Sequence, residues 1–204
     1  MNKVPSVVLA VDTTGEVLSI ALRARGKTYS VRRRARRPHD ETLLPAVESV
    51  MARAKIRWAD LDAVAAAAGP GRFTGIRIGL AFAAVVGFER NIPALALSRL
   101  EAAADACRSE KILAALPGWK EEVYHQCFRR KGNVLSSVGI ASWTAPLDWP
   151  AARAAAEAQG LTVSIDTVDA THLLTTAERR LMAGEIPPFE PFYLKPAGYE
   201  KPRH

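Results

Sequence analysis

A glycine-rich stretch at residues 69–79 constrains the fold of this chain more than any other feature. It reads Gly-Pro-Gly-Arg-Phe-Thr-Gly-Ile-Arg-Ile-Gly and directly follows the apolar run at residues 63–68. Glycine and proline at this density predict that a buried strand ends in a sharp turn. Residues 72–89 contain no proline and carry bulky apolar side chains at helical spacing, so a helix is predicted to follow the turn.

Small residues form a stripe along this predicted helix. Gly75, Gly79, Ala83 and Gly87 recur at every fourth position. Each glycine lowers helix stability by about 1 kcal/mol relative to alanine, a cost that is accepted where another backbone must come close. We therefore expect the helix to be packed on two sides, by its own domain and by a second body.

The remaining segments read as alternating strands and helices. Three strands at residues 7–11, 17–23 and 28–34 predict an antiparallel meander, followed by a helix over 41–54 with Asp40 as its N-cap. Further strands are predicted at 63–68, 92–97, 111–116, 123–129, 134–142 and 161–165. Further helices are predicted at 99–108, 150–159 and 169–183, the last capped by Asp169. The proline-rich tail from residue 186 is predicted to be an extended arm that packs by its aromatic residues.

Composition limits the classes of protein to consider. The 204 residues are 49% hydrophobic, which allows one ordinary domain or two small ones with a real core. No segment reads as a membrane-spanning helix or a secretory signal, so the expected location is the cytoplasm. Cys107 and Cys127 are isolated, which predicts neither a disulfide framework nor a zinc knuckle.

The net charge of +7 is concentrated in one run. Arg32, Arg33, Arg34, Arg36 and Arg37 follow one another closely at the end of a predicted strand. Such a run is typical either of a solvated strand edge that discourages aggregation or of a nucleic-acid footprint. Because no aromatic residue interrupts it, a base-stacking surface is not indicated.

The order of elements and several motifs together resemble one protein family. Residues 12–15 (Asp-Thr-Thr-Gly) and the stretch at 69–79 resemble the TsaB family, also called YeaZ, of bacterial tRNA threonylcarbamoyladenosine biosynthesis proteins. Residues 38–45 resemble the start of that family's first helix, and residues 192–196 resemble its C-terminal motif. The chain departs from the family pattern at Arg72, where serine is usual. The resemblance is strong over roughly the first half of the chain.

The resemblance implies an α/β fold of the actin-like ATPase (ribonuclease-H-like) type, with two lobes. Residues 1–109 would form the N-terminal lobe with the partner-binding helices, and residues 110–204 a reduced C-terminal lobe with the tail. The implied function is a noncatalytic scaffold that binds the catalytic paralogue TsaD, with the ATPase TsaE, and supports threonylcarbamoyl transfer to N6 of the adenosine beside the anticodon. The tRNAs concerned read codons beginning with A. ATP and metal are expected on the partners, and no cofactor on this chain.

The implied pairing uses the two helices predicted in the first half of the chain. Residues on both helices are the predicted partner contacts. They are Leu43, Leu44, Val47, Val50, Met51, Arg72, Phe73, Ile76, Gly79, Leu80 and Ala83. The sequence does not separate pairing with TsaD from a homodimer of the isolated chain, because an apolar helix face can bind its own copy.

Catalysis by this chain itself is not expected from the resemblance. Arg99 and Ala103 stand where the catalytic paralogue has two metal-binding histidines, and neither side chain binds a metal. Asp12, Thr13 and Thr14 are the candidates for residual phosphate binding, although a turn cap is the favoured role of Asp12. The alternatives left open are an ATP-dependent phosphotransferase or hydrolase of the same superfamily, and direct tRNA binding through residues 32–37.

Overall fold

A five-stranded mixed sheet forms the first half of the fold. The structure, a computed structural model, describes residues 5–34, 38–165 and 167–195. Strands β1 (Val8–Asp12), β2 (Val17–Ala24) and β3 (Lys27–Arg34) make the predicted antiparallel meander, and β4 (Ala63–Gly69) and β5 (Ala94–Ser98) join it parallel to β1. The strand order is β3-β2-β1-β4-β5. Every residue of β1 and β4 is buried, which explains why these strands read as continuous apolar runs.

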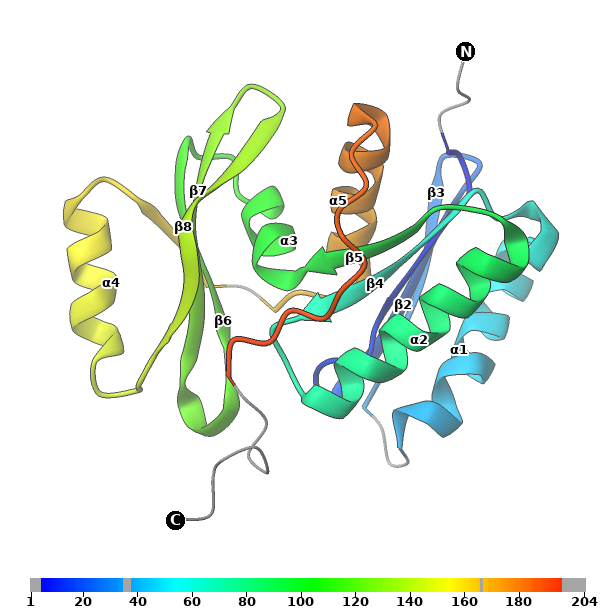
Figure 1. The fold of residues 1–204 in the computed structure, drawn as a ribbon, viewed down its shortest axis with the longest axis horizontal. Coiled ribbons are helices and arrows are strands. Elements are labelled where there is room, and N and C mark those ends of the chain that lie inside the picture. The colour runs from blue at the N-terminus through cyan, green and yellow to red at the C-terminus, as the bar shows by residue number, and fades with distance from the viewer. Residues whose placement is uncertain (1–4, 35–37, 166, 196–204) are drawn as a thin grey trace.

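Helices cover both faces of this first sheet. Helices α1 (His39–Ala54) and α2 (Phe73–Arg90) lie side by side on one face (Figure 1), and α5 (Ala170–Ala183) packs on the other. One hydrophobic core lies between the sheet and the α1–α2 pair. The second core lies on the opposite side and includes α3 (Arg99–Ala106) and α5.

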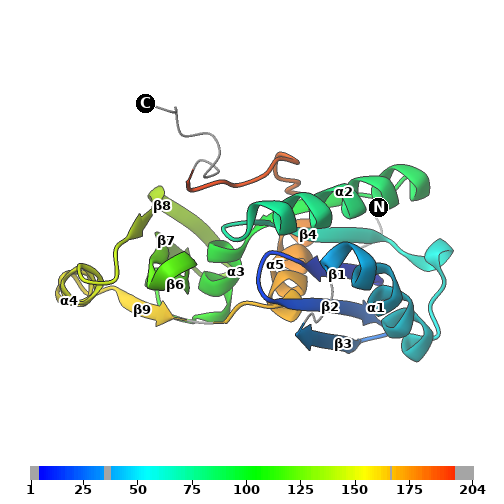
Figure 2. The same cartoon turned by 90° about the horizontal axis from the view of Figure 1, so that it is seen from below.

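A smaller four-stranded sheet forms the second half. Strands β6 (Lys111–Pro117), β7 (Val123–Lys131) and β8 (Val134–Thr144) are antiparallel, β9 (Thr162–Ile165) pairs parallel with β6, and the order is β8-β7-β6-β9. Helices α3 and α5 lie between the two sheets, whereas α4 (Trp149–Ala158) lies on the outer side of the second one (Figures 1 and 2). Short 3-10 turns at Trp58–Asp60 and Trp119–Glu121 complete the described elements.

The two halves of the sequence are interleaved in space. Helix α5 comes from the second half of the chain but packs against β1 and β2 of the first sheet. The lobe boundary after residue 109 stays a prediction. No helix among residues 5–34, 38–165 and 167–195 is long and apolar enough to cross a membrane.

The C-terminal arm packs as predicted over its described part. The Phe192 amide donates to the Ala68 carbonyl at 2.8 Å, and the Phe192 side chain contacts both hydrophobic cores. Tyr193 stacks on Phe73 of α2, with ring centroids 4.9 Å apart. The arm therefore packs against both the end of β4 and the start of α2. Its remaining residues, from Pro196 onward, lie outside the described part of the chain.

The predicted cap of the first helix is wrong. Helix α1 begins at His39, and its N-cap is Pro38, whose extended backbone (φ −51°, ψ 148°) sets the start of the helix two residues before the predicted position. Asp40 therefore lies inside the first turn, where its carboxylate accepts from the adjacent Glu41 amide at 3.1 Å. An acidic residue remains favourable there because it faces the positive end of the helix dipole.

The predicted cap of α5 is confirmed, and it predicts a dependence of stability on pH. Burial alone would raise the pKa of Asp169, but hydrogen bonds from His172 and Thr171 outweigh it and hold the pKa well below its usual value. A carboxylate whose pKa is depressed in the folded state stabilises the fold at pH values above its unfolded pKa of about 3.9, and this stabilisation is lost as the pH falls below that value.

We expect Asp169→Asn to lower the free energy of unfolding at pH 7, with the difference from the unaltered chain shrinking below about pH 4 in urea titrations. A difference independent of pH would contradict this role.

Candidate partner-binding surface

The small-residue stripe of α2 faces the chain's own first sheet. A side chain at Gly79 would place its first carbon 2.6 Å from Thr13 Oγ1, and one at Gly87 would place it 2.8 Å from Ala94 Cβ. At Gly75 the same carbon would overlap the Thr13 carbonyl oxygen. The predicted close approach is therefore made within the monomer, between α2 and the segments beside it.

This close approach predicts a large effect for Gly75→Ala. Alanine favours a helix by about 1 kcal/mol over glycine, yet here its methyl group would collide with backbone that cannot move cheaply. We expect the free energy of unfolding, measured by urea denaturation, to fall by more than about 2 kcal/mol. The matched control is Gly15→Ala, where the nearest atom would be 3.9 Å away and the change should stay within about 0.5 kcal/mol. Equal stability of the two variants would contradict the packing described.

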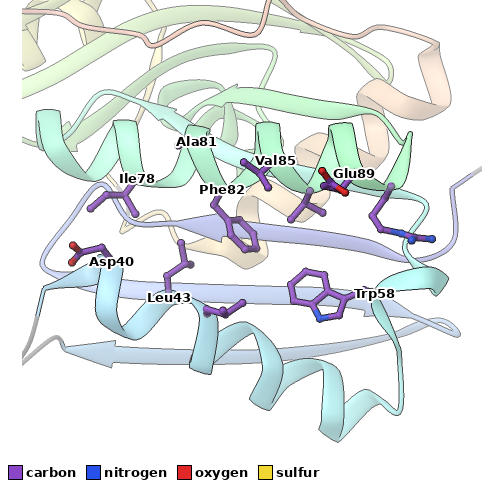
Figure 3. A pocket seen from close by; sticks show the side chains of 11 residues that line it. Asp40, Leu43, Trp58, Ile78, Ala81, Phe82, Val85 and Glu89 are labelled. Carbon is purple, nitrogen blue, oxygen red and sulfur yellow. The ribbon is translucent and has the colours of Figure 1, made fainter.

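An apolar groove runs between α1 and α2 on the outer face of the first lobe. Figure 3 shows Ile78 and Phe82 extending from α2 towards Leu43 of α1, with Asp40 at one end and Trp58 at the other. The groove encloses about 590 Å³. The lining is completed by Leu44, Ala81, Val85, Val86, Glu89 and Arg90.

The groove exposes large apolar side chains to solvent. Leu44 is 48% exposed and Val85 is 61% exposed, and Phe88 on the neighbouring surface of α2 is 84% exposed. Among the residues that line the groove, the charged ones lie at its ends, where Asp40 and Glu89 contribute carboxylates and Arg90 a guanidinium. A contiguous apolar patch with a charged rim is typical of a protein-binding surface.

The predicted partner contacts divide into exposed and buried residues. Leu44 and Arg72 are exposed, Phe73 is half-buried, and Leu43 is buried but lines the groove. The remaining seven are buried in the core beneath the helices, and their contact with a partner stays a prediction. They are Val47, Val50, Met51, Ile76, Gly79, Leu80 and Ala83. Helical spacing identified the apolar residues but not which of them the sheet would cover.

Several groove residues were not among the predicted contacts. Trp58 lies just beyond the end of α1, and its ring centroid is 6.3 Å from that of Phe82. Ile78, Phe82 and Val85 form a second apolar side of α2 beside the buried one. The signal for them was present in the sequence, because α2 carries bulky apolar residues on more than one side, as a helix packed on two sides should.

The hairpin that follows β1 satisfies its own polar groups. Asp12 Oδ1 accepts from the Thr14 amide at 2.9 Å and from the Thr14 hydroxyl at 2.6 Å, which confirms the predicted turn cap. The Thr13 hydroxyl donates to the Gly75 carbonyl at 2.6 Å. All three candidates for phosphate binding therefore already have intramolecular partners.

A buried guanidinium joins this hairpin to the rest of the molecule. Arg99 Nε donates to Asp12 Oδ2 at 3.1 Å, and only 13% of the Arg99 side chain and 3% of the Asp12 side chain are exposed. The same guanidinium donates to the carbonyl oxygens of Pro70 and Val168 at 3.1 and 3.3 Å. Arg99 thus ties together the β1 hairpin, the glycine-rich turn and the segment before α5.

Comparison with known proteins identifies the family. The family model described as TsaD, tRNA N6-adenosine threonylcarbamoyltransferase, matches residues 31–143, more than half of the chain. The solved structure of YeaZ from Pseudomonas aeruginosa superposes with a TM-score of 0.73 at 26% identity, covering 93% of this chain and all of that one. This chain belongs to the TsaB/YeaZ family.

Curated relatives agree with this assignment. The chain is 34% identical over 120 residues to the tRNA threonylcarbamoyladenosine biosynthesis protein TsaB of Haemophilus influenzae, covering 57% of this chain and 51% of that protein. It is 30% identical over 130 residues to TsaB of Escherichia coli, covering 62% and 56%. The matched stretch thus spans a little over half of each relative. The fold is the actin-like, ribonuclease-H-like fold predicted for a TsaB/YeaZ chain.

The departure from the family motif at Arg72 has a local explanation. Arg72 donates to Glu16 Oε1 at 3.0 Å, and Arg34 donates to the other oxygen of the same carboxylate at 3.1 Å. Both pairs are exposed to solvent, so Arg72 links the glycine-rich turn, through Glu16 in the turn between β1 and β2, to Arg34 of β3 with little gain in stability.

The residues that the resemblance matches to the paralogue's metal site do not fit a metal. Arg99 is a cation already paired with Asp12, and Ala103 is a buried methyl group. Glu101, between them in sequence, is held by Arg179 and Arg180 of α5. No group of three or more histidine, cysteine or acidic side chains is placed to hold a metal within residues 5–34, 38–165 and 167–195.

Proposed function

We propose that this chain is the noncatalytic subunit that binds TsaD in tRNA threonylcarbamoyladenosine biosynthesis. In this role it supports threonylcarbamoyl transfer to the adenosine beside the anticodon, and a TsaE-type ATPase completes the assembly. The observation that carries the proposal is the exposed apolar groove between α1 and α2. ATP and metal belong to the partners in this account.

The groove fits a pair of helices from the partner better than a small molecule. The groove is open and lies between two helices, with charged side chains at its ends and apolar side chains along its length. Helices pack by inserting ridges of side chains into grooves of this kind. The partner is therefore expected to contribute an apolar helix face that covers Leu44, Val85 and Phe88.

Complex formation between the purified full chain and TsaD from the same organism tests the proposal. We expect one chain to bind one TsaD in size-exclusion chromatography, and calorimetry to show a negative heat-capacity change because apolar surface is buried. A homodimer of the isolated chain is expected to dissociate when TsaD is added, since both partners use the groove. Absence of a complex at micromolar concentrations would overturn the proposal.

The enzyme alternative has a separate test. An ATP-dependent phosphotransferase or hydrolase would need Asp12 free to act on a phosphate or its metal, whereas Asp12 is buried and paired with Arg99. We expect no ATP hydrolysis by the isolated chain. Steady turnover by the unaltered protein at micromolar ATP would favour the alternative.

A further inference from the structure

The open edge of the first sheet carries an excess of positive charge. Strand β3 is the outermost strand of the first sheet, and one side of its backbone has no neighbouring strand among the residues that the structure describes. Only Tyr29 and Val31 along β3 are half-buried. The residues of this basic edge come from β3, the turn before it and the end of α1. They are Arg25, Lys27, Arg32, Arg33, Arg34 and Lys55. Arg36 and Arg37 continue the run in sequence but lie outside the described residues.

Few acidic groups neutralise the basic edge. Arg34 pairs with Glu16 at 3.1 Å, and Arg32 lies 3.6 Å from Asp169. Arg25 interacts electrostatically with Asp60, and Lys27, Arg33 and Lys55 have no ion pair within the described part of the chain. Arg53 donates to the Ser30 carbonyl at 2.9 Å and adds a seventh positive charge beside β3.

Acidic and basic side chains lie on opposite sides of α1. Glu41 and Glu48 lie three and four residues from Leu44, so they share the side of the helix that borders the groove. Arg53 lies on the opposite side and contacts β3. Strand β3 and helix α2 lie on different sides of α1 (Figure 2), so the basic edge and the groove between α1 and α2 also lie on different sides of this helix.

The chemistry of the edge fits phosphate groups better than a lipid surface. Arginine is the residue best suited to phosphate, because its planar guanidinium donates two parallel hydrogen bonds. The charged positions of β3 span roughly 24 Å, with Lys27 and Arg33 on one face of the strand and Arg32 and Arg34 on the other. None of the exposed large apolar side chains lies on β3, so nothing there would insert into a membrane or stack on bases.

We propose that the basic edge binds the phosphate backbone of folded RNA without reading its bases. This contact would be made by the isolated chain and does not rest on pairing with TsaD. Within the proposed function it would hold the tRNA substrate against the noncatalytic subunit. Such binding is governed by counterion release and therefore weakens steeply with salt.

The test removes three cations from the basic edge. The variant carries Arg25→Ala, Lys27→Ala and Arg33→Ala, and fluorescence anisotropy follows the binding of labelled, folded tRNA between about 50 and 200 mM salt. We expect affinity at about 0.1 M salt to fall at least tenfold, and the slope of log K against log salt to shrink by roughly two to three, since each lost contact contributes about 0.7 to 0.9.

The matched control removes the same charge from the second lobe. It carries Arg108→Ala, Lys111→Ala and Arg129→Ala, three exposed residues without an ion pair in the described part of the chain. The control should bind tRNA as the unaltered chain does. Equal weakening of both variants, no tRNA binding by the unaltered chain at low salt, or edge-dependent binding only to vesicles containing anionic lipid would each overturn the proposal. Val85→Asp should leave RNA binding intact, so failure of pairing and failure of RNA binding are distinguishable.

Discussion

Val85→Asp is expected to weaken binding to TsaD at least 100-fold. Val85 is 61% exposed and lines the groove, so the substitution should leave the free chain folded. In the complex, however, the carboxylate would be buried against apolar side chains without a partner, which costs several kcal/mol. A 100-fold loss corresponds to roughly 3 kcal/mol, within that range. Calorimetry with the unaltered TsaD measures the effect.

The control for this prediction is an equally exposed apolar residue outside the groove. Ile140 on β8 of the second sheet is 91% exposed. Ile140→Asp adds the same charge to the other lobe and should bind TsaD as the unaltered chain does. If Ile140→Asp abolished binding and Val85→Asp did not, the partner surface would lie on the second lobe.

Arg99→Ala is expected to lower the free energy of unfolding by about 3 to 5 kcal/mol. The substitution leaves the carboxylate of Asp12 buried without its cation, which is the most costly way to break a buried pair. It also removes the donors to the Pro70 and Val168 carbonyls. Urea denaturation measures the loss, and Asp12→Ala combined with Arg99→Ala should cost less than the sum of the two single changes.

An exposed ion pair provides the control for this prediction. Arg72 and Glu16 are each more than half exposed, and they join the same glycine-rich turn to the first sheet. Arg72→Ala should change the free energy of unfolding by no more than about 1 kcal/mol. A loss at Arg99 as small as that at Arg72 would show that the buried pair does not hold the hairpin.

The strands and helices could be predicted from local signals. Apolar runs of five to seven residues predicted β1 and β4, and the density of glycine and proline predicted the turn before α2. The boundary of α1 could not be predicted as well, because Asp40 is a better capping residue than Pro38 by type alone. The extended backbone of Pro38 decided the start of the helix instead.

The candidate site was predicted only at the level of its helices. Leu44 and Val47 have similar side chains on the same helix, yet one is half exposed and the other is fully buried, since only the packing of α1 on the sheet separates them. The pairing of Arg99 with Asp12 joins residues that are 87 positions apart. Periodicity and motif reading describe neighbours in sequence, and neither could reveal this contact.

Footprinting of the complex tests the central claim most directly. Hydroxyl radicals modify exposed aromatic and aliphatic side chains, so the modification of Leu44, Val85 and Phe88 can be compared between the free chain and the chain bound to TsaD. The account predicts strong protection of all three, with Ile140 and Leu147 of the second lobe unchanged. A complex in which Leu44, Val85 and Phe88 stay as reactive as in the free chain would contradict the central claim.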